Sequence, residues 1–204
     1  RWTTRFPIFS SASTGAAGTP VLVVLGDSLV AGYGLEPGQA FPDRLKAALA
    51  ATGRQVEIGN AGVSGDTSAG GLERLDWSVP ENADAVIVEL GANDALRGLS
   101  PAETRANLSR IVARLKERGV AVLIAGMLAP PNMGADYGRE FNAIYPEIAA
   151  EHGVALYPFF LDGVAAVPSL NLADGMHPNA AGIDVIVDRF LPAAQALVDA
   201  AAAK

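Results

Sequence analysis

Hydrophobic and polar positions follow two alternating patterns along this chain, and each pattern predicts one kind of element. Residues 21–26 read V-L-V-V-L-G, an apolar, Val-rich run that is typical of a strand buried on both faces. In residues 41–52 the apolar side chains Phe41, Leu45 and Leu49 recur at helical spacing. Continued to the end of the chain, the two patterns predict strands at 21–26, 55–59, 85–90, 120–125 and 154–159, and helices at 41–52, 68–76, 100–118, 141–152 and 179–202.

This alternation of strands and helices predicts an α/β fold. Parallel strands joined through helices need right-handed crossovers, which place helices on both faces of the sheet. We therefore expect a three-layer αβα sandwich around a flavodoxin-like, five-stranded parallel sheet in the order 2-1-3-4-5. In that order the first and third strands are neighbours, and the crevice at their carboxyl ends is where open α/β sheets bind ligands.

The first 20 residues follow neither pattern. Residues 10–20 read S-S-A-S-T-G-A-A-G-T-P, which is typical of a flexible tether. We expect 1–20 to be an extension that is flexible or docked on the surface, and 21–204 to be a single domain. The chain begins at Arg1 instead of Met, which suggests a processed product and favours export to the periplasm or outside the cell.

Composition removes several classes of function. The chain has no Cys, which excludes thiol catalysis, zinc–thiolate sites and disulfides. A net charge of −7 without a basic run argues against a nucleic-acid partner. No apolar stretch approaches the roughly 18 residues of a membrane span, so we expect no stable membrane insertion. The two histidines are far apart in sequence and suggest no metal cluster. We also expect no cofactor, and we expect the substrate to be a small molecule.

Polar residues with nucleophilic chemistry follow the first predicted strand. Gly26 ends its apolar run, and Asp27 and Ser28 come next. A serine hydroxyl needs a general base at neutral pH, usually a histidine that a carboxylate orients. His177 lies three residues after Asp174 in D-G-M-H-P and suits that task. The other histidine, His152, ends a predicted helix, where the helix dipole accounts for it.

Candidate donors for an oxyanion lie at the ends of neighbouring strands. A tetrahedral intermediate needs preorganised N–H groups, each worth roughly 3–4 kcal/mol. Gly65 lets its backbone N–H approach a ligand, Asn93 offers a side-chain amide, and the Ser28 N–H is a third candidate. Taken singly, Gly65 also fits an ordinary turn glycine, and Asn93 fits a turn cap.

Four sequence blocks resemble those of the SGNH (GDSL) hydrolases. They are G-D-S-L at 26–29, S-G-D-T at 64–67, G-A-N-D at 91–94 and D-G-M-H-P at 174–178, in the family's order and spacing, and the resemblance covers about 21–200. The surrounding residues are most similar to the bacterial branch of acyl-CoA thioesterase I, lysophospholipase L1 and arylesterase. The pattern G-x-S-x-G is absent because residue 30 is Val, so the strained elbow of the α/β-hydrolases is not expected.

The resemblance implies a role for each candidate. Ser28 would be the nucleophile, His177 the base and Asp174 its orienting carboxylate, with Ser28 N–H, Gly65 N–H and the Asn93 amide as the oxyanion hole. It also implies that residues 95–100 form a mobile loop that responds to the acyl substrate. Members of this branch are usually exported to the periplasm.

The sequence therefore predicts a serine esterase that hydrolyses carboxylic esters, with thioesters within its range. Three alternatives keep the same crevice: an acyltransferase, a carbohydrate-ester deacetylase and a non-catalytic binding module. Ordinary packing is the competing interpretation for the apolar residues that we expect to line an acyl groove. These candidates are Leu29, Ala95, Leu96, Met127, Leu128, Met133 and Tyr137.

Overall fold

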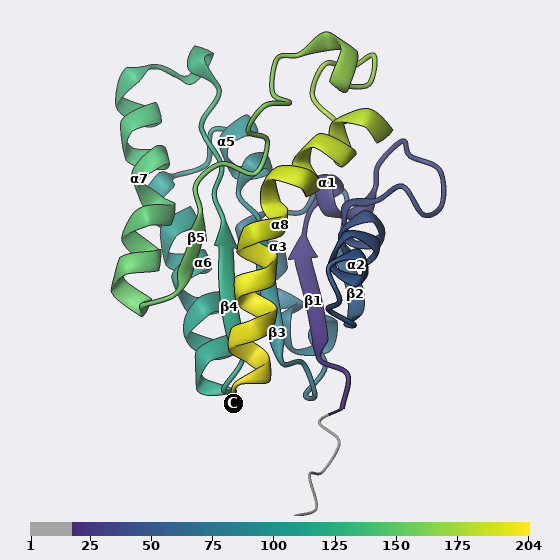
Figure 1. The fold of residues 1–204 in the computed structure, drawn as a ribbon. Coiled ribbons are helices and arrows are strands. Elements are labelled where there is room, and N and C mark those ends of the chain that lie inside the picture. The colour runs from purple at the N-terminus through teal and green to yellow at the C-terminus, as the bar shows by residue number, and fades with distance from the viewer. Residues whose placement is uncertain (1–17) are drawn as a thin grey trace, which may run out of the picture.

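A parallel sheet of five strands lies at the centre of the computed structural model, which describes residues 18–204 (Figure 1). The strands are hydrogen-bonded in the order β2-β1-β3-β4-β5, which confirms the predicted fold class and strand order. Residues 1–17, most of the expected extension, lie outside the described residues. The strands are β1 (Val21–Gly26), β2 (Glu57–Gly62), β3 (Ala85–Glu89), β4 (Ala121–Ala125) and β5 (Ala155–Tyr157).

Helices cover both faces of the sheet and give the molecule three layers (Figure 1). On one face α8 crosses the sheet beside α2, and on the other α6 packs against α3 and α7. Within the described residues no helix has both the length and the apolar character of a membrane span. The helices are α1 (Ser28–Ala31), α2 (Phe41–Ala51), α3 (Ser68–Glu73), α4 (Leu75–Ser78), α5 (Ala92–Leu96), α6 (Pro101–Glu117), α7 (Ala135–His152) and α8 (Ala180–Ala202), with 3-10 turns η1 (Pro131–Met133) and η2 (Pro168–Leu170).

The core also fixes the long segment that follows β5. Phe160 begins this segment, and its ring meets the ring of Phe41 edge to face at a centroid distance of 4.9 Å. Phe190 of α8 packs on the same Phe41 ring at 5.3 Å. All three rings are fully buried, and such aromatic contacts contribute beyond their area burial. The irregular segment 160–177, which carries Asp174 and His177, is therefore anchored at its start to the core.

Strand β2 begins two residues later and ends three residues later than its composition suggests. The sequence predicts a loop from residue 60, because Asn and Gly are rare in strands. Instead, Asn60, Ala61 and Gly62 pair in register with the last three residues of β1. A Cβ at Gly62 would lie 2.3 Å from the backbone nitrogen of Ala31. Glycine is thus required there so that α1 can pack against the strand.

The sequence also misplaces some helix boundaries. Helix α7 begins at Ala135, six residues before the predicted start, because Gly134 and Gly138 around its first turn are typical of a loop. The predicted helix 68–76 is two short helices, α3 and α4. Ser100 precedes α6 as expected, but its side chain caps no backbone N–H, so Pro101 is the main signal at that helix start.

Candidate active site

The carboxyl end of β1 presents Ser28 at the edge of the sheet. The strand ends at Gly26, Asp27 follows, and Ser28 is the first residue of α1. A Cβ at Gly26 would lie 2.3 Å from the Val30 side chain and 2.8 Å from the Glu89 carbonyl oxygen. Glycine therefore permits the tight passage from strand to helix that leaves the Ser28 side chain only part-buried.

Ser28, His177 and Asp174 form one hydrogen-bonded chain. The Ser28 hydroxyl lies 3.0 Å from His177 Nε2, although 149 positions separate the two residues in sequence. His177 Nδ1 lies 2.6 Å from Asp174 Oδ2. The structure thus brings together the three residues that sequence reasoning selected, in the geometry of a nucleophile, a base and an orienting carboxylate.

The turn between Asp174 and His177 keeps this carboxylate ionised. Asp174 Oδ1 accepts hydrogen bonds from the backbone N–H groups of His177 at 3.0 Å and Met176 at 2.9 Å. These two bonds, followed by the one from the imidazole, lower the pKa of Asp174 to about 2. An ionised Asp174 accepts the Nδ1 proton, and this tautomer leaves the Nε2 lone pair of a neutral His177 facing Ser28.

Two further contacts hold His177 in place, and sequence reasoning missed both. The ring of Tyr33 packs on the imidazole at a centroid distance of 4.5 Å, although Tyr33 itself is largely exposed. The His177 backbone carbonyl accepts a hydrogen bond of 2.7 Å from the Leu172 N–H. Only the position of Tyr33, just beyond the G-D-S-L block, could have drawn attention to it.

The three candidate oxyanion donors converge on the same edge. The Asn93 amide nitrogen donates to Asp27 Oδ2 at 3.0 Å and to the Asp66 carbonyl at 2.8 Å. Asp27 directly precedes Ser28, and Asp66 directly follows Gly65. Asn93 is therefore tied to the neighbours of both other donors. Gly65 has a φ of 81°, in the left-handed region that favours glycine.

Two arginines hold the loop that carries Gly65. Arg97 donates to the Gly65 carbonyl at 2.7 Å from the solvent side. Arg74 is buried and donates to Asp66 Oδ2 at 2.6 Å and to the Gly26 carbonyl at 2.9 Å. The loop is thus linked to the end of β1. Sequence reasoning missed both arginines, because nothing in the local pattern shows which distant carbonyl a side chain reaches.

The residues expected to line an acyl groove fall into two groups. Leu29, Ala95 and Met127 are buried in the hydrophobic core, where ordinary packing accounts for them. Leu96 and Leu128 are exposed at the carboxyl edge of the sheet, and Met133 and Tyr137 are partly exposed nearby. Tyr137 donates to the Leu99 carbonyl at 2.9 Å, which connects α7 to the loop that the sequence predicts to be mobile.

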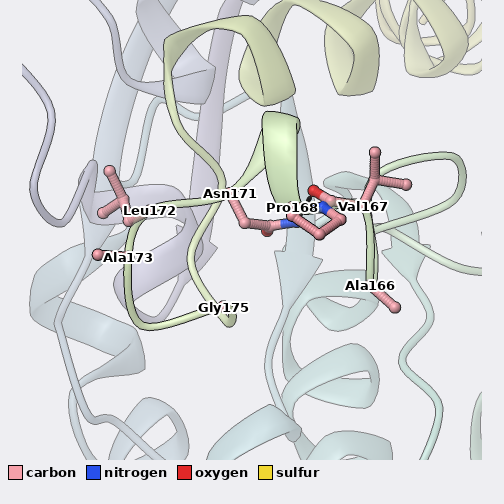
Figure 2. Close-up of a pocket in the computed structure, with 7 residues that line it drawn as sticks. All are labelled: Ala166, Val167, Pro168, Asn171, Leu172, Ala173 and Gly175. Carbon is pink, nitrogen blue, oxygen red and sulfur yellow. Dashed lines mark hydrogen bonds between the residues drawn. The ribbon is translucent and has the colours of Figure 1, made fainter.

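A pocket of about 280 Å³ lies beside the Asp174 turn (Figure 2). Asn171 reaches across it toward Pro168, and its amide nitrogen donates to the Val164 and Val167 carbonyls, each at 2.8 Å. None of Ser28, Asp174 and His177 lines this pocket. Its residues are Ala166, Val167, Pro168, Asn171, Leu172, Ala173 and Gly175.

Within residues 18–204, the acidic and histidine side chains form no metal cluster, and the second histidine lacks an orienting carboxylate. Across 18–204, no group of three or more His, Asp or Glu side chains could hold a metal ion. The second histidine, His152, contacts the hydroxyl of Ser109 at 2.7 Å on the surface formed by α6 and α7. Its nearest carboxylate, Glu151, approaches the same ring nitrogen at 3.9 Å, so it cannot orient the imidazole as Asp174 orients His177.

An αβα sandwich with a serine, a histidine and an aspartate hydrogen-bonded at the carboxyl edge of its sheet defines a class of serine hydrolases. The chain belongs to the GDSL-like lipase/acylhydrolase family, whose family model matches residues 24–185. This confirms the resemblance found in the four sequence blocks.

Named relatives and a solved structure agree with this assignment. Esterase TesA of Pseudomonas aeruginosa is 39% identical over 186 residues, which cover 91% of this chain and 92% of that protein. Thioesterase 1/protease 1/lysophospholipase L1 of Escherichia coli is 36% identical over 200 residues, covering 98% and 95%. The crystal structure of AlinE4, an SGNH-hydrolase family esterase, is 47% identical with a TM-score of 0.75, covering 88% and 97%. The protein is a serine ester hydrolase.

Proposed function

We propose that Ser28 is the nucleophile, His177 the general base and Asp174 its orienting carboxylate in the hydrolysis of carboxylic esters. The observation that carries this proposal is the continuous path of 3.0 Å from Ser28 Oγ to His177 Nε2 and 2.6 Å from Nδ1 to Asp174. A neutral imidazole in hydrogen-bond contact with a hydroxyl is the arrangement that activates serine.

The reaction proceeds through an acyl-enzyme. Ser28 Oγ attacks the ester carbonyl carbon as its proton passes to His177 Nε2, and Asp174 stabilises the imidazolium that forms. His177 then protonates the leaving alcohol or thiol as its bond to the acyl carbon breaks. Water attacks the acyl-enzyme while His177 takes its proton, and the carboxylic acid leaves as Ser28 regains a proton.

The oxyanion of each tetrahedral intermediate is proposed to bind three N–H groups. The backbone N–H groups of Ser28 and Gly65 donate no hydrogen bond to another group of residues 18–204 and are available to a ligand. The Asn93 amide supplies the third. Donors fixed in place before reaction stabilise the developing charge without reorganisation.

We propose that the acyl portion of the substrate lies on the exposed apolar side chains at the carboxyl edge. Such residues occur in the segments that follow four of the strands and in the turn beside His177, and an acyl chain covering them would be removed from water. They are Tyr33, Val63, Leu96, Leu99, Leu128 and Met176. This surface and the names of the relatives support esters and thioesters of fatty acids as the substrate class.

Hydrolysis by Ser28→Ala and by a matched control tests these roles. Purified protein is assayed on p-nitrophenyl esters from acetyl to palmitoyl, on acyl-CoA and on a lysophospholipid. Ser28→Ala should lose at least about 10³-fold in kcat while keeping its fold. Ser109→Ala removes the other serine hydroxyl in contact with a histidine and should keep full activity. Normal turnover by Ser28→Ala would contradict the proposal, and product analysis with added alcohols would reveal acyl transfer.

We also propose that the protein acts in the periplasm or outside the cell. The small-residue stretch at 10–20 and the resemblance to an exported branch support this compartment. Fractionation of a bacterial cell that expresses the natural gene tests it. Esterase activity released by osmotic shock is expected, whereas activity confined to the spheroplast would contradict the proposal.

A further inference from the structure

One buried side chain, Asp27, contacts both the nucleophile turn and the oxyanion amide. Asp27 is fully buried between β1 and Ser28. Its Oδ1 accepts a 3.0 Å hydrogen bond from the Leu29 backbone N–H and so caps α1, whose first residue is Ser28. Its Oδ2 accepts a 3.0 Å hydrogen bond from Asn93. The two oxygens of one carboxylate therefore set the distance between two parts of the site.

The Asn93 amide depends on this contact for its orientation. Its nitrogen carries two N–H bonds, and its second acceptor is the Asp66 carbonyl at 2.8 Å. An oxyanion can share one of these hydrogens in a three-centre bond, an arrangement that is common in proteins. Sharing requires that the amide keeps its plane, and Asp27 fixes one side of that plane. Without Asp27 the amide is held by a single bond and can rotate.

We propose that Asp27 is a positioning residue of the ester hydrolase, which holds the Asn93 amide against the Ser28 turn and acts on the reaction only through Asn93. The inference rests on the proposed roles of Ser28 and Asn93. It assigns Asp27 a part in transition-state stabilisation although its side chain is buried and does not touch substrate.

The surroundings of Asp27 show how its charge is controlled. Glu89 is paired with Gly26 across the β1–β3 register, is fully buried, and accepts from the Asp27 backbone N–H at 3.4 Å. Two neighbouring buried carboxyls resist simultaneous ionisation. Burial raises the pKa of Asp27 to about 6 and, together with the charge of Asp27, raises that of Glu89 well above its usual value. As pH rises, Asp27 therefore loses its proton before Glu89 does.

Other charged and titratable groups face this pair from several elements. His177 lies on the carboxyl-edge segment and lowers the pKa of Asp27, whereas Asp66 after β2 raises it. Burial, followed by charges that include those of Glu89 and Asp27, raises the pKa of the Tyr145 hydroxyl of α7. Arg74 donates to the adjacent Gly26 carbonyl. Protonation of Asp27 below pH 6 would replace one of its two acceptor positions with a donor. The contact with Asn93 or with Leu29 would then be lost.

Two substitutions separate positioning from helix capping. In Asp27→Asn the side chain has one acceptor oxygen in place of two. Because Asn is a strong N-cap, this oxygen stays on the Leu29 N–H and the contact with Asn93 is lost. In Asp27→Ser the hydroxyl still caps α1, because Ser and Asp are comparable N-caps, but it is too short to reach Asn93. Both variants should lower kcat on a short-chain p-nitrophenyl ester by roughly 10- to 100-fold with little change in KM. Wild-type kcat in folded Asp27→Ser would overturn the proposal.

A double-mutant cycle tests whether Asp27 acts through Asn93. Asn93→Ala alone should lower kcat by about 10²-fold, and Asp27→Ser added to it should lower kcat by no more than about threefold further. Losses that multiply in the double variant would mean that Asp27 acts independently and would overturn the inference. Asp84→Asn is the matched control, because Asp84 also binds a backbone N–H, that of Val21 at 2.7 Å, at the opposite end of β1.

The pH profile gives a readout that a purely structural role would leave unchanged. Protonation of Asp27 should add one proton uptake to the acid side of the wild-type kcat/KM profile, and Asp27→Ser should lose that uptake. The same acid-side dependence of kcat/KM on pH in wild type and Asp27→Ser would contradict the proposal. The outcomes also distinguish its failure from that of the proposed function. If Ser28→Ala retains activity, the catalytic roles are wrong, whereas loss of activity in Ser28→Ala alone would leave those roles intact and overturn only the role of Asp27.

Discussion

Glu89 is a buried carboxyl group beside Asp27, and its burial makes the stability of the protein depend on pH. It is fully buried, and one of its carboxyl oxygens has no hydrogen-bond partner in the structure. Burial and the neighbouring Asp27 raise its pKa well above the usual value of 4.5. The folded protein therefore keeps a proton that the unfolded chain releases. Stability is lost as pH rises from about 4.5 toward the folded-state pKa, because the unfolded state binds fewer protons.

Glu89→Gln is expected to flatten this pH dependence. The amide has nearly the shape of the protonated acid but cannot ionise in the unfolded chain. Relative to wild type, the variant should gain up to about 1.4 kcal/mol of unfolding free energy for each pH unit within that window. Urea denaturation between pH 4.5 and 8 measures the difference. Parallel stability curves for the two proteins would show that Glu89 does not carry the proton.

At the residue scale, the sequence predicts which distant side chains meet where sequence motifs contain residues of complementary chemistry. Ser28, Asp174 and His177 stand in blocks whose residue types already suggest a nucleophile, a carboxylate and a base, and the structure brings them into contact. Glu89 also contacts the backbone N–H of Asp27 beside Ser28, but their meeting depends on the register between β1 and β3. No local pattern encodes that register.

At the scale of elements, Arg74 joins segments that the chain order separates. It follows α3 and is almost completely buried. Its guanidinium binds Asp66, which follows Gly65, and the carbonyls of Gly26 on β1 and Ala61 on β2. One side chain thus holds together the ends of two strands and the loop that presents Gly65.

Arg74→Gln should therefore destabilise the protein and loosen the loop that carries Gly65 and Asp66. Breaking one side of a buried ion pair leaves an uncompensated charge and typically costs about 3–5 kcal/mol. Arg139→Gln removes a guanidinium from an exposed pair with Asp136 and should cost less than about 1 kcal/mol. Equilibrium unfolding in urea measures the loss of unfolding free energy in each variant. Equal losses would contradict the stabilising role of the buried Arg74–Asp66 pair.

The sequence predicts helices and strands best where the spacing of apolar residues determines which element forms. The buried strands β1, β3 and β4 were found within about a residue of their ends, which is the usual uncertainty of such boundaries. The end of β2 was not found, because Asn60 and Gly62 are poor strand formers that adopt strand geometry only through pairing with β1. Tertiary pairing there overrides local propensity.

At the scale of the molecule, exposed apolar side chains of the described residues gather at the carboxyl edge of the sheet, where Ser28 and His177 meet. Within residues 18–204, six of the seven large apolar residues that are exposed lie there, in segments that follow the strands or adjoin His177, and Trp77 on α4 is the seventh. Exposed apolar side chains gathered at one place often mark a binding site. This distribution suits an enzyme whose substrates carry an acyl chain.

Leu96→Ser should weaken the binding of long acyl chains specifically. Loss of an apolar contact worth roughly 1–2 kcal/mol predicts a KM increase of about 5- to 30-fold on an octanoyl ester, with little change on an acetyl ester. Trp77→Ser, which removes an exposed apolar residue outside this edge, should leave both KM values unchanged. Equal KM values for wild type and Leu96→Ser on the octanoyl ester would exclude Leu96 from the acyl surface.

The sequence predicts the strand order of the molecule, but it does not predict which acyl chains the protein prefers. The order β2-β1-β3-β4-β5 results from handed crossovers between hydrophobic runs, which are visible in the chain. Under the proposed function, acyl preference would depend on how the segments holding Leu96, Leu128 and Tyr137 lie against each other. Those positions are set by single contacts such as that of Tyr137 with the Leu99 carbonyl.

Covalent labelling with an alkyl phosphonate ester measures the central claim, the nucleophilicity of Ser28, most directly. The phosphorus is attacked as an ester carbonyl would be and leaves a stable adduct on the nucleophile. Mass spectrometry of the digested protein should find one adduct, on the peptide that contains Ser28, and His177→Ala should slow its formation strongly. An unlabelled Ser28 in protein that still hydrolyses esters, or an adduct on another residue, would contradict the account.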